Sequence, residues 1–469
     1  MPFELRGRKR GVSNPVRTLA AAGALLAVVL AAPSTPGAMA PMTPEETSLT
    51  PGGYVYGVSR DRPSAPKDGP KAWPWACSLR HRACVHAEPA LAPAVMPALA
   101  SLDRSWEVLT GAMDLPEPDA DPATGAYDLY LLDEPGLAET ALSARTQPSF
   151  YDRASAYSLV DGRLDGCMRD LEIARQLARA IGARMAPSTD EGSARGGAGY
   201  LARLAVPCAI GMIDGVDVAQ AHSERTLVAT MPLEAPRFVR PVADGSALFW
   251  WWLDDAFGRI PGGMVAATWA LTATRTPAGE NRWAGEPDGW DVLRHTFKGA
   301  LTTGSTLDDL LVDFAVARAQ AGDLADDQHF VESTTLGAAA RVAIDWDIPW
   351  PAAPRRLASP RALGPMGASY VRVSRAGAPP GSRLRVELEW ENHARMRWVA
   401  VRLGPDGRER SRVLVGSHDR TTEANLSLAE LDAADAVLLV GVNCGDWKPF
   451  DPDDRDWQPH GWLLTVAQE

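Results

Sequence analysis

The sequence predicts an α+β protein in which a domain of mixed strands and helices precedes an antiparallel β-sandwich. Two changes of pattern support this fold class. Short apolar runs give way to segments of helical period that continue to about residue 321. A Pro-rich segment, residues 348–360, then separates them from runs in which apolar and polar residues alternate. A chain of 469 residues is long enough for two or three domains.

The first 40 residues have the pattern of a secretory signal peptide. A basic segment (RGRKR) precedes an apolar run, Leu19 to Ala32, and the small residues Ala38 and Ala40 form a cleavage site. We therefore expect export, a mature chain that begins near Pro41, and no integral membrane segment once the signal is removed. The alternative is an uncleaved N-terminal anchor. Residues 41–75, rich in Pro, Gly and Ser, are expected to form an extended arm.

The charge of the chain argues against nucleic acid as a partner. The formal net charge is −12, and because residues 1–40 carry +4, the remainder carries −16. A body of this charge repels polyphosphates and anionic membrane surfaces. A protein or a peptide, of unknown identity, is therefore the class of partner that we expect.

Strands and one helix are predicted between the arm and residue 161. A short run around Val85 and the segments Tyr127–Leu132 and Ala154–Val160 have the composition of strands. Residues 93–110 are predicted to form a helix, because apolar side chains three and four residues apart share one face: Val95, Leu99, Leu102, Trp106 and Leu109.

Two helices are predicted next. Residues 167–183 carry one apolar line, formed by Leu171, Ala174, Ala178 and Ile181. After a loop at residues 187–189, a second helix runs from Glu191 to about Val206. Its three glycines weaken this helix, because each costs roughly 1 kcal/mol relative to alanine.

Residues 246–321 are predicted to be helical again. Three consecutive tryptophans, Trp250 to Trp252, point in different directions on a helix, so we expect core packing rather than a platform for a sugar. Ser305 is the expected N-cap of the last helix, with Asp308 three residues later in a variant of the capping box. The apolar face of that helix contains Leu307, Leu310, Leu311 and Phe314.

The C-terminal region, residues 361–469, is predicted to be the β-sandwich. Leu384, Val386, Leu388 and Trp390 alternate with charged residues, as in a strand with one buried face. Residues 398–403, 437–442 and 462–466 are further apolar runs of strand length. Several short strands within about a hundred residues are typical of an antiparallel sandwich.

Five cysteines fit export into an oxidising compartment. Cys77 and Cys84 bracket a short loop, and Cys167 and Cys208 stand at ends of helices that would be antiparallel neighbours. We predict these two pairs as disulfides and Cys444 as the remaining free thiol. The alternative is five free, partly buried thiols.

The order of these elements resembles that of secreted bacterial zinc peptidases of the gluzincin type. The resemblance covers roughly residues 80–469, and it rests on the segments YDLYLL (127–132), ASAYSLVD (154–161), TDEGSA (189–194) and WWLDDAFG (251–258). The family implies a mixed N-terminal sheet, a metal-binding helix, a glutamate-bearing helix, a helical lower half and often a C-terminal β-sandwich. Architecture alone does not carry function.

The residues that hold zinc in that family have no counterpart here. Aligning RQLAR (175–179) with H-E-x-x-H places Arg175 and Arg179 at the histidines and Gln176 at the general base. A second register makes Glu172 the base, with Leu171 and Arg175 at the ligand positions. Arginine keeps its proton and offers no lone pair to a metal, so neither register restores a zinc site.

Glu191 matches the third ligand of the family, although it follows Arg179 by fewer residues than is usual. It is either a relic of that ligand or an acid that favours the start of its helix. An ion pair of Glu191 with Arg175 or Arg179 would replace the metal, and the alternative is that both arginines are solvated. We expect no cofactor.

Other chemical motifs are weak. His81, His86 and Glu88 form the one tight group with histidines, and we expect it at the surface. The acidic loop at residues 451–456 lacks the spacing of an EF-hand. The chain has no G-x-S-x-G, P-loop or H-x-x-E-H motif.

The sequence thus predicts an exported protein on a metallopeptidase-like scaffold whose catalytic site has been lost, with a binding or structural role. One alternative is an active secreted metal-dependent peptidase with non-standard ligands. Another is a surface adhesion protein that acts through its C-terminal sandwich.

Overall fold

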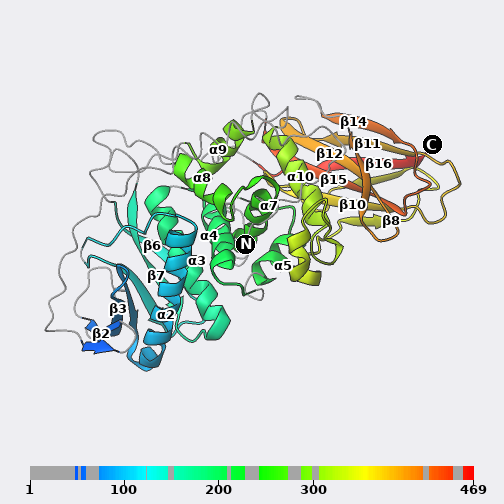
Figure 1. Ribbon diagram of the computed structural model, residues 1–469. Helices are drawn as coiled ribbons and strands as arrows, with labels where there is room; N and C mark the ends of the chain where they lie inside the picture. Colours follow the sequence, from blue (N-terminus) through cyan, green and yellow to red (C-terminus); the bar gives the residue numbers. More distant parts are fainter. Residues whose placement is uncertain are drawn as a thin grey trace.

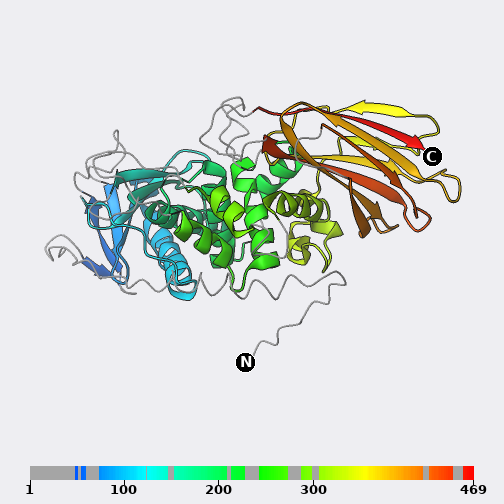
Figure 2. The ribbon, with the colours of Figure 1, turned by 90° about the horizontal axis from the view of Figure 1, so that it is seen from above.

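The computed structural model describes residues 48–50, 54–59, 73–122, 124–145, 153–187, 189–208, 213–225, 227, 242–272, 287–297, 306–415, 422–446 and 458–469. The described part is elongated, with a sheet and its helices at one end, further helices in the middle and two packed sheets at the other end (Figures 1 and 2). The predicted α+β class is confirmed. The predicted signal peptide and the acidic loop at 451–456 lie outside the described residues.

The N-terminal sheet has seven strands in the order β1-β2-β3-β4-β5-β7-β6. Strands β1 to β4 form an antiparallel meander, β4, β5 and β7 are parallel, and β6 pairs antiparallel with β7 at the edge. The strands are β1 Ser48–Thr50, β2 Tyr54–Ser59, β3 Trp73–Ser78, β4 Ala83–Ala87, β5 Tyr127–Leu132, β6 Ala138–Arg145 and β7 Ala154–Asp161. The predicted arm, residues 41–75, therefore contributes strands to this sheet.

Two helices cover one face of the sheet: α2 (Val95–Trp106), which continues as a π-helical turn to Ala112, and α3 (Gly166–Met185). Both helices were predicted from their spacing. The apolar faces of α2 and α3 share one core with Tyr127, Leu129 and Leu131, the alternate residues of β5.

Helices fill the middle of the molecule: α4 Glu191–Ala205, α5 Ile213–Ala221, α7 Ala247–Phe257, α8 Gly263–Leu271, α9 Gly289–Thr296 and α10 Leu307–Ala319. Two 3-10 segments, η6 Gly322–Leu324 and η7 Val331–Ala340, follow α10. The three tryptophans of α7 are buried, as predicted for core residues. None of the described helices has both the length and the apolarity needed to cross a bilayer.

The N-cap of α10 lies one residue later than predicted. Thr306, not Ser305, caps the helix: its Oγ1 accepts a hydrogen bond from the Asp309 backbone N–H, and the Asp309 carboxylate accepts one from the Thr306 N–H. The chain offers the same hydroxyl-to-acid spacing in both registers. The register with Thr306 is used because the helix begins at Leu307, a buried residue of its apolar face.

Two sheets form the C-terminal sandwich, in the orders β13-β12-β15-β10-β8 and β14-β11-β16-β9. All described pairs are antiparallel except β8 with β10. The strands are β8 Trp346–Ile348, β9 Arg355–Ala358, β10 Ala368–Ser374, β11 Leu384–Trp390, β12 Ala394–Leu403, β13 Glu409–Val415, β14 Glu423–Leu428, β15 Ala436–Asp446 and β16 Trp462–Gln468. Strand β9 and the end of β8 come from residues 348–360, the predicted linker, so the sheets begin before residue 361.

The five-stranded sheet is buried on both faces. In β15, Val437 and Leu439 face the second sheet, whereas Leu438 and Val440 belong to the core formed with the helices. Helix α10 lies on this outer face, and the Tyr370 hydroxyl of β10 donates to the Ala315 carbonyl oxygen of α10 at 2.8 Å. Burial on both faces explains why the sequence of β15 is a nearly continuous apolar run.

The predicted disulfides, Cys77–Cys84 and Cys167–Cys208, are both present. The first pair stands directly opposite across the β3–β4 ladder. The second joins the start of α3 to the residues that follow α4, and these two helices pack together. Cys444 is a free, buried thiol, as predicted, and burial raises its pKa well above the usual range.

The glycines of α4 allow neighbouring helices to approach it closely. A Cβ added at Gly196 would overlap Ser246 Oγ, and one at Gly197 would lie 2.9 Å from the Trp269 ring. The Ser246 hydroxyl donates to the Gly192 carbonyl oxygen at 2.7 Å, which holds the start of α7 against α4. These glycines lower the helix propensity of α4, but they allow α7 and α8 to pack closely against it.

We predict that Gly196→Ala destabilises the protein by about 1–3 kcal/mol, because overpacking against Ser246 outweighs the gain in helix propensity. The matched control is Gly111→Ala, since a Cβ there would have no neighbour within 4 Å. The control should be neutral or stabilising. Urea unfolding followed by circular dichroism measures both, and equal effects of the two substitutions would contradict the prediction.

Candidate functional site

The residues aligned with a zinc-binding helix lie on the part of α3 that packs against the sheet. Arg175 and Gln176 are buried, and Arg179 is half-buried. Glu172, one turn earlier, holds the first two. Its carboxylate accepts a hydrogen bond from Arg175 Nη1 at 2.9 Å and another from Gln176 Nε2 at 2.6 Å. Three of the polar side chains in this part of α3 are therefore linked to each other.

This cluster continues into the sheet through hydroxyl groups. Thr140 of β6 donates from Oγ1 to Gln176 Oε1 at 2.6 Å, and its oxygen lies 2.8 Å from Ser158 Oγ of β7. The Tyr127 hydroxyl of β5 donates to the same Ser158 oxygen at 2.8 Å. Burial raises the pKa of Tyr127 far above its usual value, so this phenol remains a donor. A polar chain thus runs from α3 across three strands.

The charge of Arg175 is compensated inside the protein. Burial alone would lower the pKa of its guanidinium, but the carboxylates of Glu172 and Asp244 outweigh burial and the opposing effect of Arg195, and the pKa is raised. Arg195 lies 3.3 Å from Asp244 through Nη1 and Oδ1. Buried ions that are paired in this way avoid the cost of an isolated charge.

These residues do not fit zinc. Arg175 carries a proton on each nitrogen, Gln176 uses both ends of its amide in hydrogen bonds, and both oxygens of Glu172 are occupied. The second register does not provide a zinc site either, because the side chain of Leu171 has no atom that can bind a metal. A catalytic zinc needs about three protein ligands and an open position. We therefore derive no step that uses a metal at this helix.

An arginine–glutamate pair lies on α3, but its acid is Glu172 and not the predicted Glu191. Glu172, three residues before Arg175, is the described partner of that arginine. Glu191 is the first residue of α4, whose N-cap is Asp190, but its side chain is outside the described set. Its pairing and its status as a relic ligand therefore stay predictions.

The prediction that the group of His81, His86 and Glu88 lies at the surface is wrong for His86. His86 is buried in β4, 2.9 Å from the Asp128 carboxylate, and its ring stacks on Tyr130 with 4.9 Å between centroids. Alternate residues of β4 and β5 place these side chains on the same face of the sheet. The periodicity of β4 shows only that Val85 and His86 face opposite sides, and the burial of both comes from residues of other strands.

Along the described chain, Cys84, His86 and Asp128 are the one group of three that could hold a metal by distance. Cys84 is bonded to Cys77 and has no thiolate to offer. The remaining two residues hydrogen-bond to each other. We interpret this group as part of the sheet's packing.

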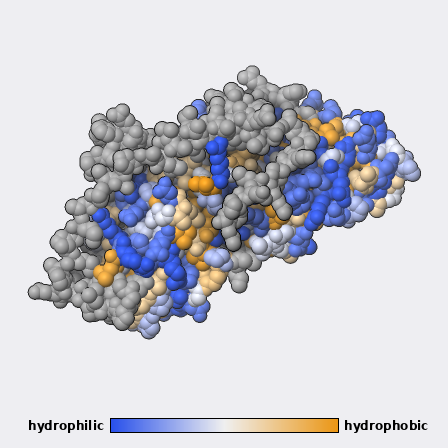
Figure 3. All heavy atoms as spheres, in the orientation of Figure 1, coloured by the Kyte–Doolittle hydropathy of each residue, from blue (hydrophilic) through white to orange (hydrophobic). Residues whose placement is uncertain are grey.

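A pocket of about 180 Å³ opens beside Arg179, between the edge strand β6 and helices α3, α4 and α8. Apolar atoms gather over the helices in the middle of the face seen in Figure 3, whereas the described surface of the sandwich on that face is mostly hydrophilic. The pocket is lined by Thr140, Leu142, Arg179, Gly182, Ala183, Ala186, Pro187, Thr189, Ala194 and Trp269. It combines one cation, hydroxyl groups and an indole ring.

Sequence reasoning found Arg179 but missed the other polar and aromatic residues of this site. Thr140 and Leu142 lie in β6, whose sequence AETALSAR is poor in β-branched and aromatic residues. Trp269 lies on a helix that is apolar on all sides, so no periodicity singles it out. Only tertiary packing brings them to α3.

A buried carboxylate lies close to the wall of this pocket. Asp288 caps α9, and Asp190, next to Thr189 of the pocket wall, caps α4. Burial, with the nearby Asp190 carboxylate in a smaller role, raises the pKa of Asp288 to about 7 despite hydrogen bonds from backbone N–H groups. Asp288 therefore binds a proton in the folded state at pH values where an exposed aspartate does not.

No protein-family model matches the chain, and a search of curated proteins returned no relative. The resemblance to zinc peptidases therefore stays an expectation from the sequence.

We predict that Asp288→Asn flattens the dependence of stability on pH. Between about pH 4, the value for an unfolded aspartate, and the folded pKa of about 7, the folded state holds a proton that the unfolded state lacks. The stability of the unsubstituted protein therefore falls as pH rises through this window. An asparagine caps the helix without a charge, so the variant should be more stable at pH 8, by on the order of 2 kcal/mol.

Chemical unfolding at a series of pH values measures this effect. Asp217→Asn, at an exposed position of α5, is the matched control and should leave the slope unchanged. If stability depends on pH as steeply in Asp288→Asn as in the unsubstituted protein, the pH dependence does not come from Asp288.

Proposed function

We propose that the protein is an exported, catalytically degenerate metallopeptidase-like protein that binds a partner peptide or protein without hydrolysing it. The observation that carries this proposal is the hydrogen-bonded chain Arg175–Glu172–Gln176–Thr140. It occupies the place where the resemblance puts the metal ligands and the general base. A guanidinium and an amide held by a carboxylate supply neither metal ligands nor a proton acceptor for water.

The neighbouring pocket supports a binding role. Strand β6 is the last strand of the described sheet, so its outer edge can receive an extended segment through backbone hydrogen bonds. The pocket lies directly beside this edge, since Thr140 and Leu142 of β6 line it. A peptide laid along β6 would direct a side chain toward Arg179 and Trp269. This arrangement favours an extended peptide with an acidic or aromatic side chain at that position.

Two disulfides support the expected location. Cross-links of this kind persist in oxidising compartments and are rare in the cytosol. An active metal-dependent peptidase with non-standard ligands is one alternative. Adhesion through the sandwich is the other alternative, and it would use the four-stranded sheet, the loops or the exposed edge strand β13, because helices cover the central strands of the five-stranded sheet.

We predict that the purified mature chain holds less than stoichiometric zinc and does not cleave peptides. The physical reason is that α3 offers Arg175, Gln176 and Arg179 in place of two imidazoles and a carboxylate. Elemental mass spectrometry and a broad peptide-library assay measure the two properties. About one zinc per chain together with cleavage that a chelator abolishes would overturn the loss of catalysis.

We predict that peptides selected from a displayed library by the mature protein bind along β6 at the pocket. Ala194→Leu, which fills the pocket, and Arg179→Met, which removes its cation, should each weaken a selected peptide by about tenfold or more in Kd. Arg184→Met is the matched control on the same helix. Arg184 lies outside the pocket lining and donates to the Glu117 carbonyl oxygen.

Calorimetric titration gives the Kd values, and thermal unfolding checks that each variant is folded. The control should change the Kd by less than about twofold, which is within 0.4 kcal/mol. Unchanged affinity in both pocket variants would place the binding site elsewhere. Selected peptides that bind the sandwich instead would favour the adhesion alternative.

A further inference from the structure

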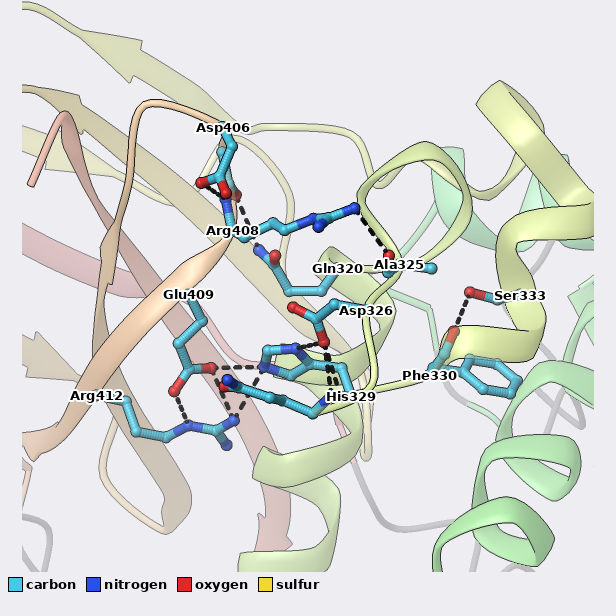
Figure 4. Close-up of polar contacts among 12 residues, drawn as sticks. Gln320, Ala325, Asp326, His329, Phe330, Ser333, Asp406, Arg408, Glu409 and Arg412 are labelled. Carbon is cyan, nitrogen blue, oxygen red and sulfur yellow. Dashed lines mark hydrogen bonds and ion pairs between the residues drawn. The ribbon is translucent and has the colours of Figure 1, made fainter. Parts of the chain in front are cut away.

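A buried histidine joins the helical part of the molecule to the β-sandwich. His329 lies in the turn between η6 and η7, and it faces β13 of the five-stranded sheet (Figure 4). Its side chain is 2% exposed. Its ring lies between two carboxylates: Nδ1 is 2.7 Å from Asp326 Oδ1 in its own turn, and Nε2 is 2.8 Å from Glu409 Oε2 in β13.

The two short contacts fit the charged form of the ring. A neutral imidazole has one N–H donor and one lone pair, whereas an imidazolium donates from both nitrogens. Ionised carboxylates only accept. The bonds from His329 and from Arg412 lower the pKa of Glu409, although its burial acts in the opposite direction. Glu409 is therefore an anion, and a lone pair on Nε2 at this distance would be repelled by it.

The surrounding charges also favour the imidazolium. The groups that face this cluster are Asp326 of the turn, Asp313 of α10, and Glu409 and Arg412 of β13. Arg412 Nη2 lies 3.4 Å from His329 Nε2 and opposes a second positive charge there. However, its guanidinium is held by both oxygens of Glu409 at 2.7 Å and by Asp313 at 2.8 Å. Among the described groups, three carboxylates face one guanidinium, and this excess of negative charge favours a positively charged imidazole ring.

The other described polar contacts between this turn and the sandwich are weaker. Arg408 donates to the Ala325 carbonyl oxygen at 3.2 Å, and Gln320 donates to the Gly407 carbonyl oxygen at 3.3 Å (Figure 4). Both bonds end on neutral carbonyl groups, and both are longer than the bonds of His329. Charge-assisted bonds are roughly twice as strong as neutral ones; both partners are charged in the bond of His329 to Glu409, whereas Arg408 is the one charged partner in its bond to a carbonyl group. His329 is thus the strongest link of the turn to β13.

We infer that His329 is a proton-operated clamp, which holds the turn at residues 325–330 against β13 when its ring is charged and releases it when the ring loses a proton. This regulatory device is independent of the proposed peptide binding. Release on deprotonation follows because Nε2 then presents a lone pair to the Glu409 carboxylate, and the bond between these two groups is lost. Histidine is the side chain whose charge changes near neutral pH.

The sign of the pH dependence follows from the two kinds of group. The imidazolium contributes to the contact at low pH, and this contribution is lost as pH rises and the ring is deprotonated. Glu409 has a lowered pKa, so its contribution is present above the value for an unfolded glutamate and is lost as pH falls through the lower, folded value. The clamp is therefore closed at mildly acidic pH. At higher pH the imidazolium loses its proton, and at lower pH the carboxylates gain one.

Hydrogen exchange of the full mature chain, read by mass spectrometry and corrected for intrinsic rates, tests the clamp. Protection of residues 322–330 and 404–412 should fall about tenfold or more between about pH 5.5 and pH 8. In His329→Gln the protection should be low and independent of pH. His460→Gln is the matched control, because His460 also lies between two carboxylates, Glu391 and Asp446, but entirely within the sandwich.

The control should keep the pH profile of the unsubstituted protein in both segments. Protection that does not change with pH in the unsubstituted protein would overturn the inference, and so would an unchanged profile in His329→Gln. If that variant does not fold, Glu409→Gln decides. Removal of one carboxylate should move the transition to lower pH, and an unmoved transition would also overturn the inference. Peptide affinity of these variants is measured separately, so failure of the clamp leaves the proposed function testable.

Discussion

Burial of the five-stranded sheet on both faces is the constraint on which the rest of the structure depends. One face of β15 packs on the second sheet and the other on α10, so the sandwich and the helices share apolar residues. Tyr370 adds a hydrogen bond to the Ala315 carbonyl oxygen within this contact. Apolar area removed from water in this way is worth roughly 25 cal/mol per Å², which makes the two parts one unit in energetic terms. Contacts at its rim, such as that of His329, can therefore change without separating the two parts.

The second constraint is compensation of buried charge around α3. Arg175 and Arg195 are both largely buried, and each is matched by a carboxylate, Glu172 or Asp244. A helix that buries guanidinium groups needs acids beside them, because an unpaired buried ion costs several kcal/mol. Truncation of Glu172 alone would leave such an ion, so these residues form one unit.

Local pattern predicted much of the fold but little of the site. Helices α2 and α3 and strands β5 and β7 were predicted because their periodicity is carried by neighbouring residues. Both disulfides followed from spacing and helix order. Strand β6, the pocket residue Trp269 and the burial of His86 depend on partners far along the chain. Arg175 was singled out, yet its partner Glu172 was weighed only as a displaced base, because helical spacing alone does not show which side chain turns toward which.

The pocket and the sandwich are joined by contiguous packing. Helix α4 forms one wall of the pocket and holds α7 through Ser246 and Gly192. Helix α7 meets α10 where Phe249 and Phe314 pack edge to face at 5.1 Å between centroids, and α10 lies on β15. Such a path does not by itself couple two sites. Coupling requires an element that has two conformational states, and both sites must shift the equilibrium between them. The turn that carries His329 directly follows α10 and η6, so it lies at the sandwich end of this path.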